Sequence, residues 1–227
     1  MLKYLINLLF PKLCLSCNSL LLKNEKIICS ECNHNLPITN HHILENNDTT
    51  KKFYGIIPIE FSAAMLYFHK KGIVQNLIHN LKYKNHQEVG TLLGKWYAKD
   101  LESILKTKTV SEIIPVPLHK KRLEERGYNQ ITTFCEALSD ELKIPYNTHL
   151  LYRNRYSKTQ TKKDKESRKE VSNALFDVTF TAVDHNKHFL LIDDVMTSGA
   201  TLEACAKALL KIPNSKVSIV TIAYTLS

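Results

Sequence analysis

The chain has 227 residues, 44% of them hydrophobic, which is enough for one packed domain and a small accessory unit. This length and composition exclude a disordered or low-complexity protein. The formal net charge of +9 is typical of proteins that bind nucleic acid or a phosphate-rich small molecule, and equally of a protein with a solvated basic surface.

The first twelve residues, MLKYLINLLFPK, begin like a signal peptide, but the apolar part is short and Pro11 interrupts it. No small-residue cleavage site follows, so we expect a cytoplasmic protein. No apolar stretch of the chain approaches the ~20 residues that a membrane span requires. The favoured structure is a short amphipathic helix that docks on its own protein, because four apolar residues have helical spacing: Leu2, Leu5, Ile6 and Leu9.

Two CxxC pairs, Cys14/Cys17 and Cys29/Cys32, are separated by eleven residues. Two residues between cysteines let both thiolates of one turn face the same ion, and two such turns complete a tetrahedral site with bonds of ~2.3 Å. Disulfides are the main alternative, but a cytoplasmic chain lies in a reducing compartment. We therefore predict zinc, with a structural role because the cysteines supply all four ligands.

The remaining cysteines and the nearby histidines have simpler interpretations. Cys135 and Cys205 lie alone inside helical patterns, so they are predicted to be small buried hydrophobic residues. His34, His41 and His42 follow a complete set of four cysteine ligands, so they are predicted to be ordinary surface histidines.

A domain boundary is expected near residue 50. Residues 14–40 are polar, carry the four cysteines and are too few to bury a core of their own. They continue into TNHHILENNDTTKK (39–52), which has the composition of a polar linker. We therefore divide the chain into an N-terminal helix and zinc-binding module (1–50) and a main domain (51–227).

Strand and helix patterns alternate along the main domain, which predicts an α/β fold around a largely parallel sheet. Period-two alternation predicts a strand or a hairpin at 61–68, and short apolar runs or alternation predict strands at 112–117, 188–194 and 216–225. Apolar residues at helical spacing predict helices at 72–83, 88–105, 129–142 and 201–212. The side chains expected to face inward are Ile73, Leu77, Ile78 and Leu81 in the first helix, Leu92, Leu93, Trp96, Leu101 and Leu105 in the second, and Ile131, Phe134, Leu138 and Leu142 in the third.

A doubled acid, Asp193 and Asp194, comes directly after the apolar run of the strand at 188–194. The carboxyl end of a parallel strand is where open α/β sheets bind their ligands. A flexible turn with small hydroxyl residues then leads into a helix, and free N–H groups at a helix start form a phosphate cradle. The residues of this turn are Thr197, Ser198, Gly199 and Thr201.

Carboxylates repel phosphate, so one ligand must satisfy both features. A ligand with a phosphate and a sugar does so, because the acids accept hydrogen bonds from vicinal ribose hydroxyls or lie near Mg²⁺ while the turn holds the 5′-phosphate. The alternative is an acid pair that only caps a helix or forms ion pairs.

The stretch LLIDDVMTSGAT (190–201) resembles the phosphoribosyl-pyrophosphate (PRPP) binding motif of type I phosphoribosyltransferases. It departs from that motif only at Ser198, where a second threonine is usual and the hydroxyl is retained. The resemblance implies that Asp193 and Asp194 are the catalytic-site acids that orient the ribose. It also implies that PRPP binds along Val195, Met196, Thr197, Ser198, Gly199, Ala200 and Thr201.

A second stretch, IIPVPLHKKRLEERGYNQ (113–130), resembles the signature of the ComF family of competence proteins. That family combines an N-terminal four-cysteine zinc module with a phosphoribosyltransferase-like domain, in the order found here. The resemblance implies a type I phosphoribosyltransferase-like, mostly parallel sheet with flanking helices, plus a small zinc-ribbon-like module. It also implies a role in handling single-stranded DNA, with the DNA-uptake machinery, during natural transformation.

Within this signature, basic residues follow a strand that ends in two prolines, where the resemblance places a pyrophosphate loop. Arg122 and Arg126 would clamp pyrophosphate bidentately, and Gly127 would let the backbone approach it. The alternative is a solvated basic loop that pairs with Glu124 and Glu125. The full pyrophosphate-binding set expected from the resemblance is Lys120, Arg122, Arg126, Gly127 and Arg168.

The charged segment 153–173 has little apolar periodicity, and in type I enzymes the corresponding segment is a lid over the substrate. Gln160 and Arg168 match family positions, but the asparagine expected three residues after that arginine is Val171. This departure affects the alignment of the lid.

Three functions remain open at this stage. An enzyme would transfer phosphoribose from PRPP to an unidentified base, with Mg²⁺ and the basic loops neutralising the departing pyrophosphate. A non-catalytic PRPP sensor would keep the pocket without turnover. A nucleic-acid-handling protein would use its positive charge with aromatic residues such as Tyr152 and Tyr156.

Overall fold

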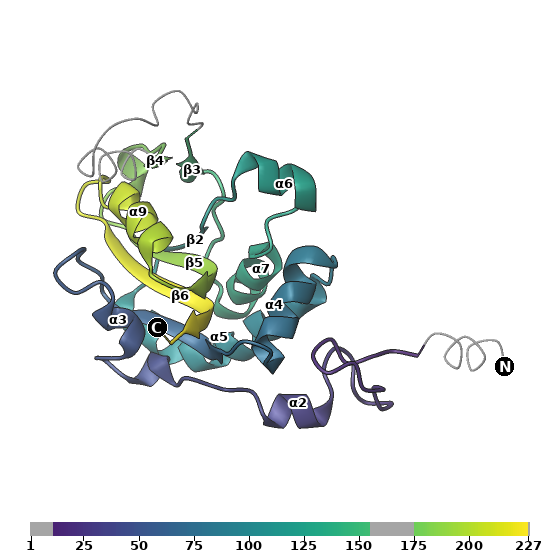
Figure 1. Ribbon diagram of the computed structural model, residues 1–227. Helices are drawn as coiled ribbons and strands as arrows, with labels where there is room; N and C mark the ends of the chain where they lie inside the picture. The colour runs from purple at the N-terminus through teal and green to yellow at the C-terminus, as the bar shows by residue number, and fades with distance from the viewer. Residues whose placement is uncertain (1–10, 155–174, 227) are drawn as a thin grey trace, which may run out of the picture.

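The computed structural model describes residues 11–154 and 175–226 of the chain. Its centre is a four-stranded sheet with the strand order β1-β6-β5-β2. Every neighbouring pair in this sheet is parallel, which confirms the predicted arrangement (Figure 1). The strands are β1 (Ser62–Phe68), β2 (Glu112–Pro115), β5 (His188–Met196) and β6 (Lys216–Thr225).

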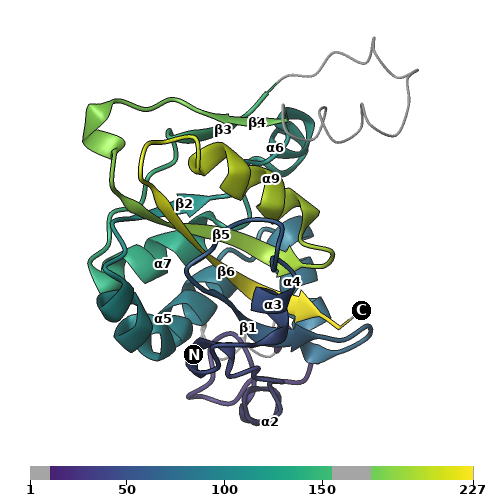
Figure 2. The same cartoon turned by 90° about the vertical axis from the view of Figure 1, so that its left-hand side faces the viewer.

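The sheet is buried on both faces, as the near-continuous apolar runs of its strands require. In β5, Leu190 and Ile192 belong to one buried cluster, whereas Phe189 and Leu191 belong to a second cluster across the sheet. Helices α4 (Ile73–Tyr83), α5 (Glu88–Lys108) and α7 (Thr132–Leu142) cover the first face. Helix α9 (Ala200–Leu209) covers the second, and Figure 2 shows it in front of the sheet.

Helices α5 and α7 pack against each other at two glycines of α5. A Cβ at Gly94 would lie 2.7 Å from the backbone oxygen of Phe134, and one at Gly90 would lie 2.2 Å from the hydroxyl of Thr133. This close contact turns α5 relative to the predicted face. Trp96 and Leu92 are only partly buried, while Val89, Gly90, Tyr97 and Ala98 are buried together with the predicted Leu93, Leu101 and Leu105.

Two further strands, β3 (Leu151–Arg153) and β4 (Phe176–Val178), form a small antiparallel sheet that contacts α9. The turn η3 (Ala182–Asp184) then leads into β5. Sequence patterns did not predict this small sheet, because three-residue strands are too short to show a period.

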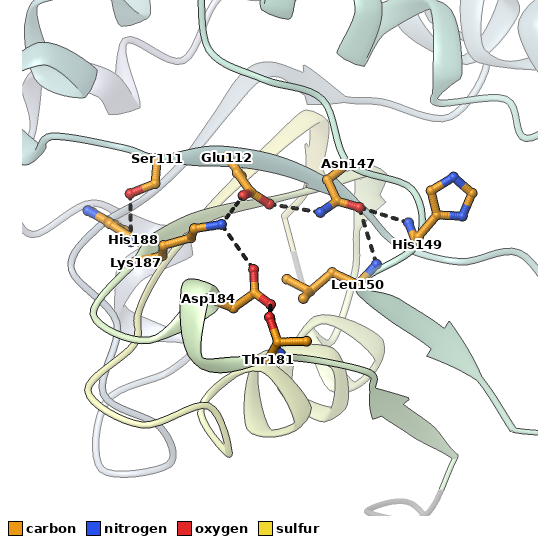
Figure 3. Close-up of polar contacts among 9 residues, drawn as sticks. All are labelled: Ser111, Glu112, Asn147, His149, Leu150, Thr181, Asp184, Lys187 and His188. Carbon is orange, nitrogen blue, oxygen red and sulfur yellow. Dashed lines mark hydrogen bonds and ion pairs between the residues drawn. The ribbon is translucent and has the colours of Figure 1, made fainter.

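The start of β5 is held by a buried polar network, shown in Figure 3. The Lys187 ammonium lies 2.5 Å from a Glu112 oxygen and 2.9 Å from an Asp184 oxygen. Asn147 donates to Glu112 at 2.9 Å, and the Thr181 N–H donates to Asp184 at 2.9 Å. The Thr181 N–H and then Lys187 lower the pKa of Asp184. The network fixes the ends of β2 and β5 opposite the acid pair.

The predicted linker, 39–52, is instead part of the packed structure. It contains η1 (His41–Ile43) and α3 (Asp48–Lys51). Asn47 caps α3 and donates to the backbone oxygens of His41, Leu44 and Ser62, so buried polar groups are satisfied by the chain itself. The prediction of a surface His41 was wrong, because it is 3% exposed and contacts the rings of Tyr67 and Tyr224 edge-on.

Two predictions about the ligand-binding segments need correction. The strand β5 does not end at the acid pair but continues through Met196, paired with β6. The basic segment after β2 is not a loop but the helix α6 (Lys120–Arg126), which the side chain of His119 caps. The N-terminal helix predicted for residues 2–9 and most of the predicted lid lie outside the described residues.

Candidate active site and metal centre

The two acids of β5 have different surroundings. Asp194 is 5% exposed and both of its carboxylate oxygens have partners. Oδ1 lies 2.7 Å from the ammonium of Lys82, at the end of α4, and Oδ2 accepts from the Gln130 amide at 2.6 Å. Asp194 is therefore a buried, paired carboxylate held between the end of α4 and the turn that precedes α7.

Asp193 lies toward the turn that opens α9. It is partly exposed, it accepts the backbone N–H of Asp194 at 2.8 Å, and it lines a small hollow of about 50 Å³ with residues 195–202. Burial and the neighbouring charge of Asp194 raise the pKa of Asp193 to about 7, while Lys82 opposes them. One acid of the pair is thus held by a lysine and an amide, and the pKa of the other is raised toward neutral pH.

The turn after β5 has the form of an anion cradle. Gly199 adopts φ +83° immediately before α9, a conformation that favours glycine, and a Cβ there would also meet the ring of Phe53 at 3.3 Å. Gly199 offers no capping side chain, and the Ala200 N–H makes only a long contact of 3.5 Å with the Ser198 hydroxyl, so the N–H groups at the start of α9 are available to an anion. Thr197, Ser198 and Thr201 are exposed around them, whereas Met196 is buried and offers only its backbone.

The predicted pyrophosphate residues are distributed over α6 and its end. Lys120 pairs with Glu124 at 3.5 Å on the exposed surface, as the alternative interpretation expected. Arg122 and Arg126 instead line a cavity, and Gly127 ends α6 with φ +76°. Arg168 lies outside the described residues.

A chain of polar contacts joins Arg126 to the acid pair. Its guanidinium donates to the Gln130 oxygen at 2.7 Å, and the Gln130 amide donates in turn to Asp194. Arg126 also lies over the ring of Tyr83, 4.9 Å from its centroid. Lys82 and Gln130 were missed by the sequence analysis. Gln130 is the last residue of the quoted signature, but nothing in its spacing indicates its partner.

The four clustered cysteines come together as predicted. Their sulfur atoms all lie within 4.8 Å of one another, and none is in a disulfide. Backbone N–H groups donate to the sulfurs, from Ser16 and Cys29 to Cys14 and from Cys32 to Cys29, at 3.3–3.4 Å. Helix α2 (Ser30–His34) begins next to the second pair.

The donor set fits a bound cation. Hydrogen bonds from Ser19 lower the pKa of Cys17 to about 6, which favours the thiolate, whereas burial raises the pKa of Cys32. Buried thiols are uncharged without a cation, and a divalent metal converts them to thiolates. The arrangement can therefore hold a metal such as zinc with four sulfur ligands.

The cysteine cluster is attached to α4. The amides of Asn76 and Asn80 each donate at 2.7 Å to the backbone oxygens of Ser16 and Leu15. Cys14, Cys29 and Cys32 are also buried in the same apolar cluster as α4 and α5. The helix that positions Lys82 beside Asp194 thus rests on the cysteine cluster.

The two cysteines outside the cluster are 0% exposed, as predicted. Burial raises the pKa of both the Cys135 and the Cys205 thiol. Among the described helices, none is long and apolar enough to cross a membrane.

Comparisons with known proteins agree with the fold and with the four-cysteine architecture. Residues 132–227 match the family model described as phosphoribosyl transferase domain. Competence protein F of Haemophilus influenzae is 29% identical over 63% of this chain and 64% of its own length. Competence protein ComFC of Bacillus subtilis is 26% identical over 88% and 78%, and DNA utilization protein YhgH of Escherichia coli K12 is 24% identical over 83% and 80%.

A solved glutamine PRPP amidotransferase from B. subtilis aligns with a TM-score of 0.43 at 15% identity, over 63% of this chain and 30% of that one. The parallel sheet, its acid pair and the family match define a phosphoribosyltransferase-like protein. With the four-cysteine cluster, the similarity to competence protein F, ComFC and YhgH agrees with the predicted resemblance to the ComF family of competence proteins.

Proposed function

We propose that the protein binds PRPP at the carboxyl end of β5 and acts in the cytoplasm on single-stranded DNA during natural transformation. The observation that carries the proposal is the acid pair beside an uncapped helix start, with a glycine at positive φ between them. The names of the relatives, competence and DNA utilization proteins, support the cellular role.

Each part of the site has a chemical task in this proposal. The N–H groups at residues 197–201 hold the 5′-phosphate, helped by the positive end of α9. Asp193 accepts hydrogen bonds from the ribose hydroxyls, and Asp194, fixed by Lys82 and Gln130, keeps that edge of the site negative. Bound Mg²⁺ would neutralise the diphosphate and would lie toward Asp193, the acid without a lysine partner at hydrogen-bond distance.

If phosphoribose is transferred, the protein needs no nucleophilic side chain. Charge develops at ribose C1 while pyrophosphate departs, and fixed cations beside the diphosphate stabilise it. Arg122 and Arg126 supply these cations from α6, and positioning of the two reactants supplies the rest. A housekeeping phosphoribosyltransferase and a non-catalytic PRPP sensor share this binding step and differ in turnover with a supplied acceptor.

Arg126→Ala is expected to weaken PRPP binding by about 10-fold to 150-fold and to affect ribose 5-phosphate binding much less. Only PRPP carries a diphosphate, and a charge-assisted hydrogen bond contributes about 1.5–3 kcal/mol. Calorimetric titration of the one variant with both ligands makes the comparison. Equal losses for the two ligands would place Arg126 away from the diphosphate.

The zinc ion is proposed to be structural. The four sulfur ligands fill its coordination sphere, and three of them are buried in the core that supports α4 and α5. The metal would thereby fix α4, which carries Lys82.

Cells in which Asp193 and Asp194 are both replaced by asparagine are expected to take up DNA but to yield few transformants. The pocket would act after uptake, so imported strands would not become recombinants. Uptake of labelled DNA and transformant counts are measured at matched protein levels, with Lys99→Ala as a control far from the pocket. Normal transformation would favour a housekeeping phosphoribosyl transfer.

A further inference from the structure

A second cavity adjoins the acid pair on the side of α4 and α6. It has a volume of about 610 Å³ and is lined by Lys82, Tyr83, Lys84, Asn85, Arg122, Glu125, Arg126 and Tyr128. Its basic side chains come from two helices that meet at this point, the end of α4 and the whole of α6. Lys82 belongs both to this cavity and to the pair with Asp194, so the cavity and the acid pair share a wall.

Three of the four cations of this cavity have no acidic partner among the described residues. Four cations and one carboxylate line it, and Glu125 pairs outward with Lys121 at 3.9 Å. Lys82 pairs with Asp194, and Arg126 contacts the neutral Gln130 and Tyr83. Within residues 11–154 and 175–226, Lys84, Arg122 and Arg126 form no ion pair. Cations that converge without counter-charges favour an anionic ligand.

The size and the aromatic residues of the cavity indicate more than an inorganic anion. Pockets of about 300–1,000 Å³ enclose ligands much larger than a diphosphate. Tyr83 is 64% exposed at the cavity, and Tyr128, whose hydroxyl donates to the Leu81 oxygen, stands beside it. An exposed ring beside basic side chains suits a base that stacks while its phosphate is held.

We infer that this cavity binds the phosphate and base of a nucleotide, as the acceptor-side ligand of the PRPP site. The inference rests on the proposed function, because it names the ligand that lies beside PRPP. Lys84 holds the phosphate and Tyr83 stacks on the base, while Arg122 and Arg126, on the opposite helix, face the diphosphate of PRPP. The contacts from Arg126 through Gln130 to Asp194 make the occupied cavity a direct neighbour of the ribose site. The nucleotide is either free or the end of a single strand.

The test uses the full-length protein and thymidine 5′-monophosphate as the probe, with and without saturating ribose 5-phosphate to fill the phosphate turn. Lys84→Ala is expected to weaken binding of the probe about tenfold or more in both conditions. Lys99→Ala, which removes the same charge from an exposed position on α5, is expected to leave it unchanged. Deoxyribose 5-phosphate, which lacks the base, is expected to bind at least fivefold more weakly.

A 5′-phosphorylated trithymidylate separates the two sources of the nucleotide. Binding much tighter than that of the monophosphate assigns the end of a strand, and equal binding assigns a free nucleotide. The inference is overturned if Lys84→Ala and Lys99→Ala behave alike, or if deoxyribose 5-phosphate binds as tightly as the nucleotide. Failure of the proposed function would appear separately, as PRPP binding that survives loss of both acids.

Discussion

Replacing Cys14 by serine is expected to remove zinc from the protein and to lower its melting temperature by roughly 6–12 °C. Cys14 is fully buried in the cluster that also contains the inward residues of α4 and α5. Loss of the metal would leave two buried thiols, Cys29 and Cys32, without a cation against that core, at a cost of at least ~3 kcal/mol. In a chain of this length each kcal/mol corresponds to about 2–4 °C.

Elemental analysis and thermal unfolding of the variant make the measurement. Cys135→Ala is the matched control, because it removes an equally buried thiol outside the cluster and should retain one equivalent of zinc. A Cys14→Ser protein that keeps full zinc and melts like the original would exclude a four-sulfur site.

Asp193→Asn is expected to stabilise the ligand-free protein and to weaken PRPP binding by about 10-fold to 150-fold. The folded-state pKa of Asp193 is raised to about 7, above the ~3.9 of an unfolded aspartate. The folded state therefore holds this proton more tightly, so stability falls as the pH rises from about 4 to 7 and stays low above that. Asparagine removes this penalty, and it also removes the charged acceptor for the ribose hydroxyls.

Asp194→Asn is the contrasting variant. It leaves Lys82 without its partner in a site where that side chain is only 19% exposed, so it is expected to destabilise the protein by about 1–3 kcal/mol. Urea unfolding at pH 5 and pH 8 compares the two variants. Asp193→Asn should raise the free energy of unfolding more at pH 8 than at pH 5. An equal effect at the two pH values would show that the account of the pair is wrong.

The strands of the parallel sheet and the position of the acid pair in β5 could be predicted because they depend on local patterns, whereas the order of the strands was not predicted. The four apolar residues 189–192 and the mostly apolar stretch 217–224 define β5 and β6, and a CxxC spacing positions two sulfurs within one turn. The contacts of the acids could not be predicted. Lys82 and Gln130 approach Asp194 from positions 112 and 64 residues away, and no sequence period reports such a distance.

The errors have the same physical origin. His41 and Asn47 are polar and were assigned to a linker, yet they are buried because backbone oxygens and aromatic rings of other elements surround them. α6 was interpreted as a loop because its sequence, KKRLEER, has no apolar face. In the structure none of its seven residues is buried. Its i,i+4 pairs of lysine and glutamate support a helix that needs no such face.

The most direct test of the PRPP assignment is a calorimetric titration of the full-length protein with PRPP, with Mg²⁺ present and with Mg²⁺ omitted. Omission is preferable to a chelator, which would also extract the cysteine-bound metal. The account predicts one site per chain, binding that depends on Mg²⁺, and loss of that binding when Asp193 and Asp194 are both asparagine. PRPP affinity that is unchanged in the double variant, or absent from the original protein in Mg²⁺, would contradict it.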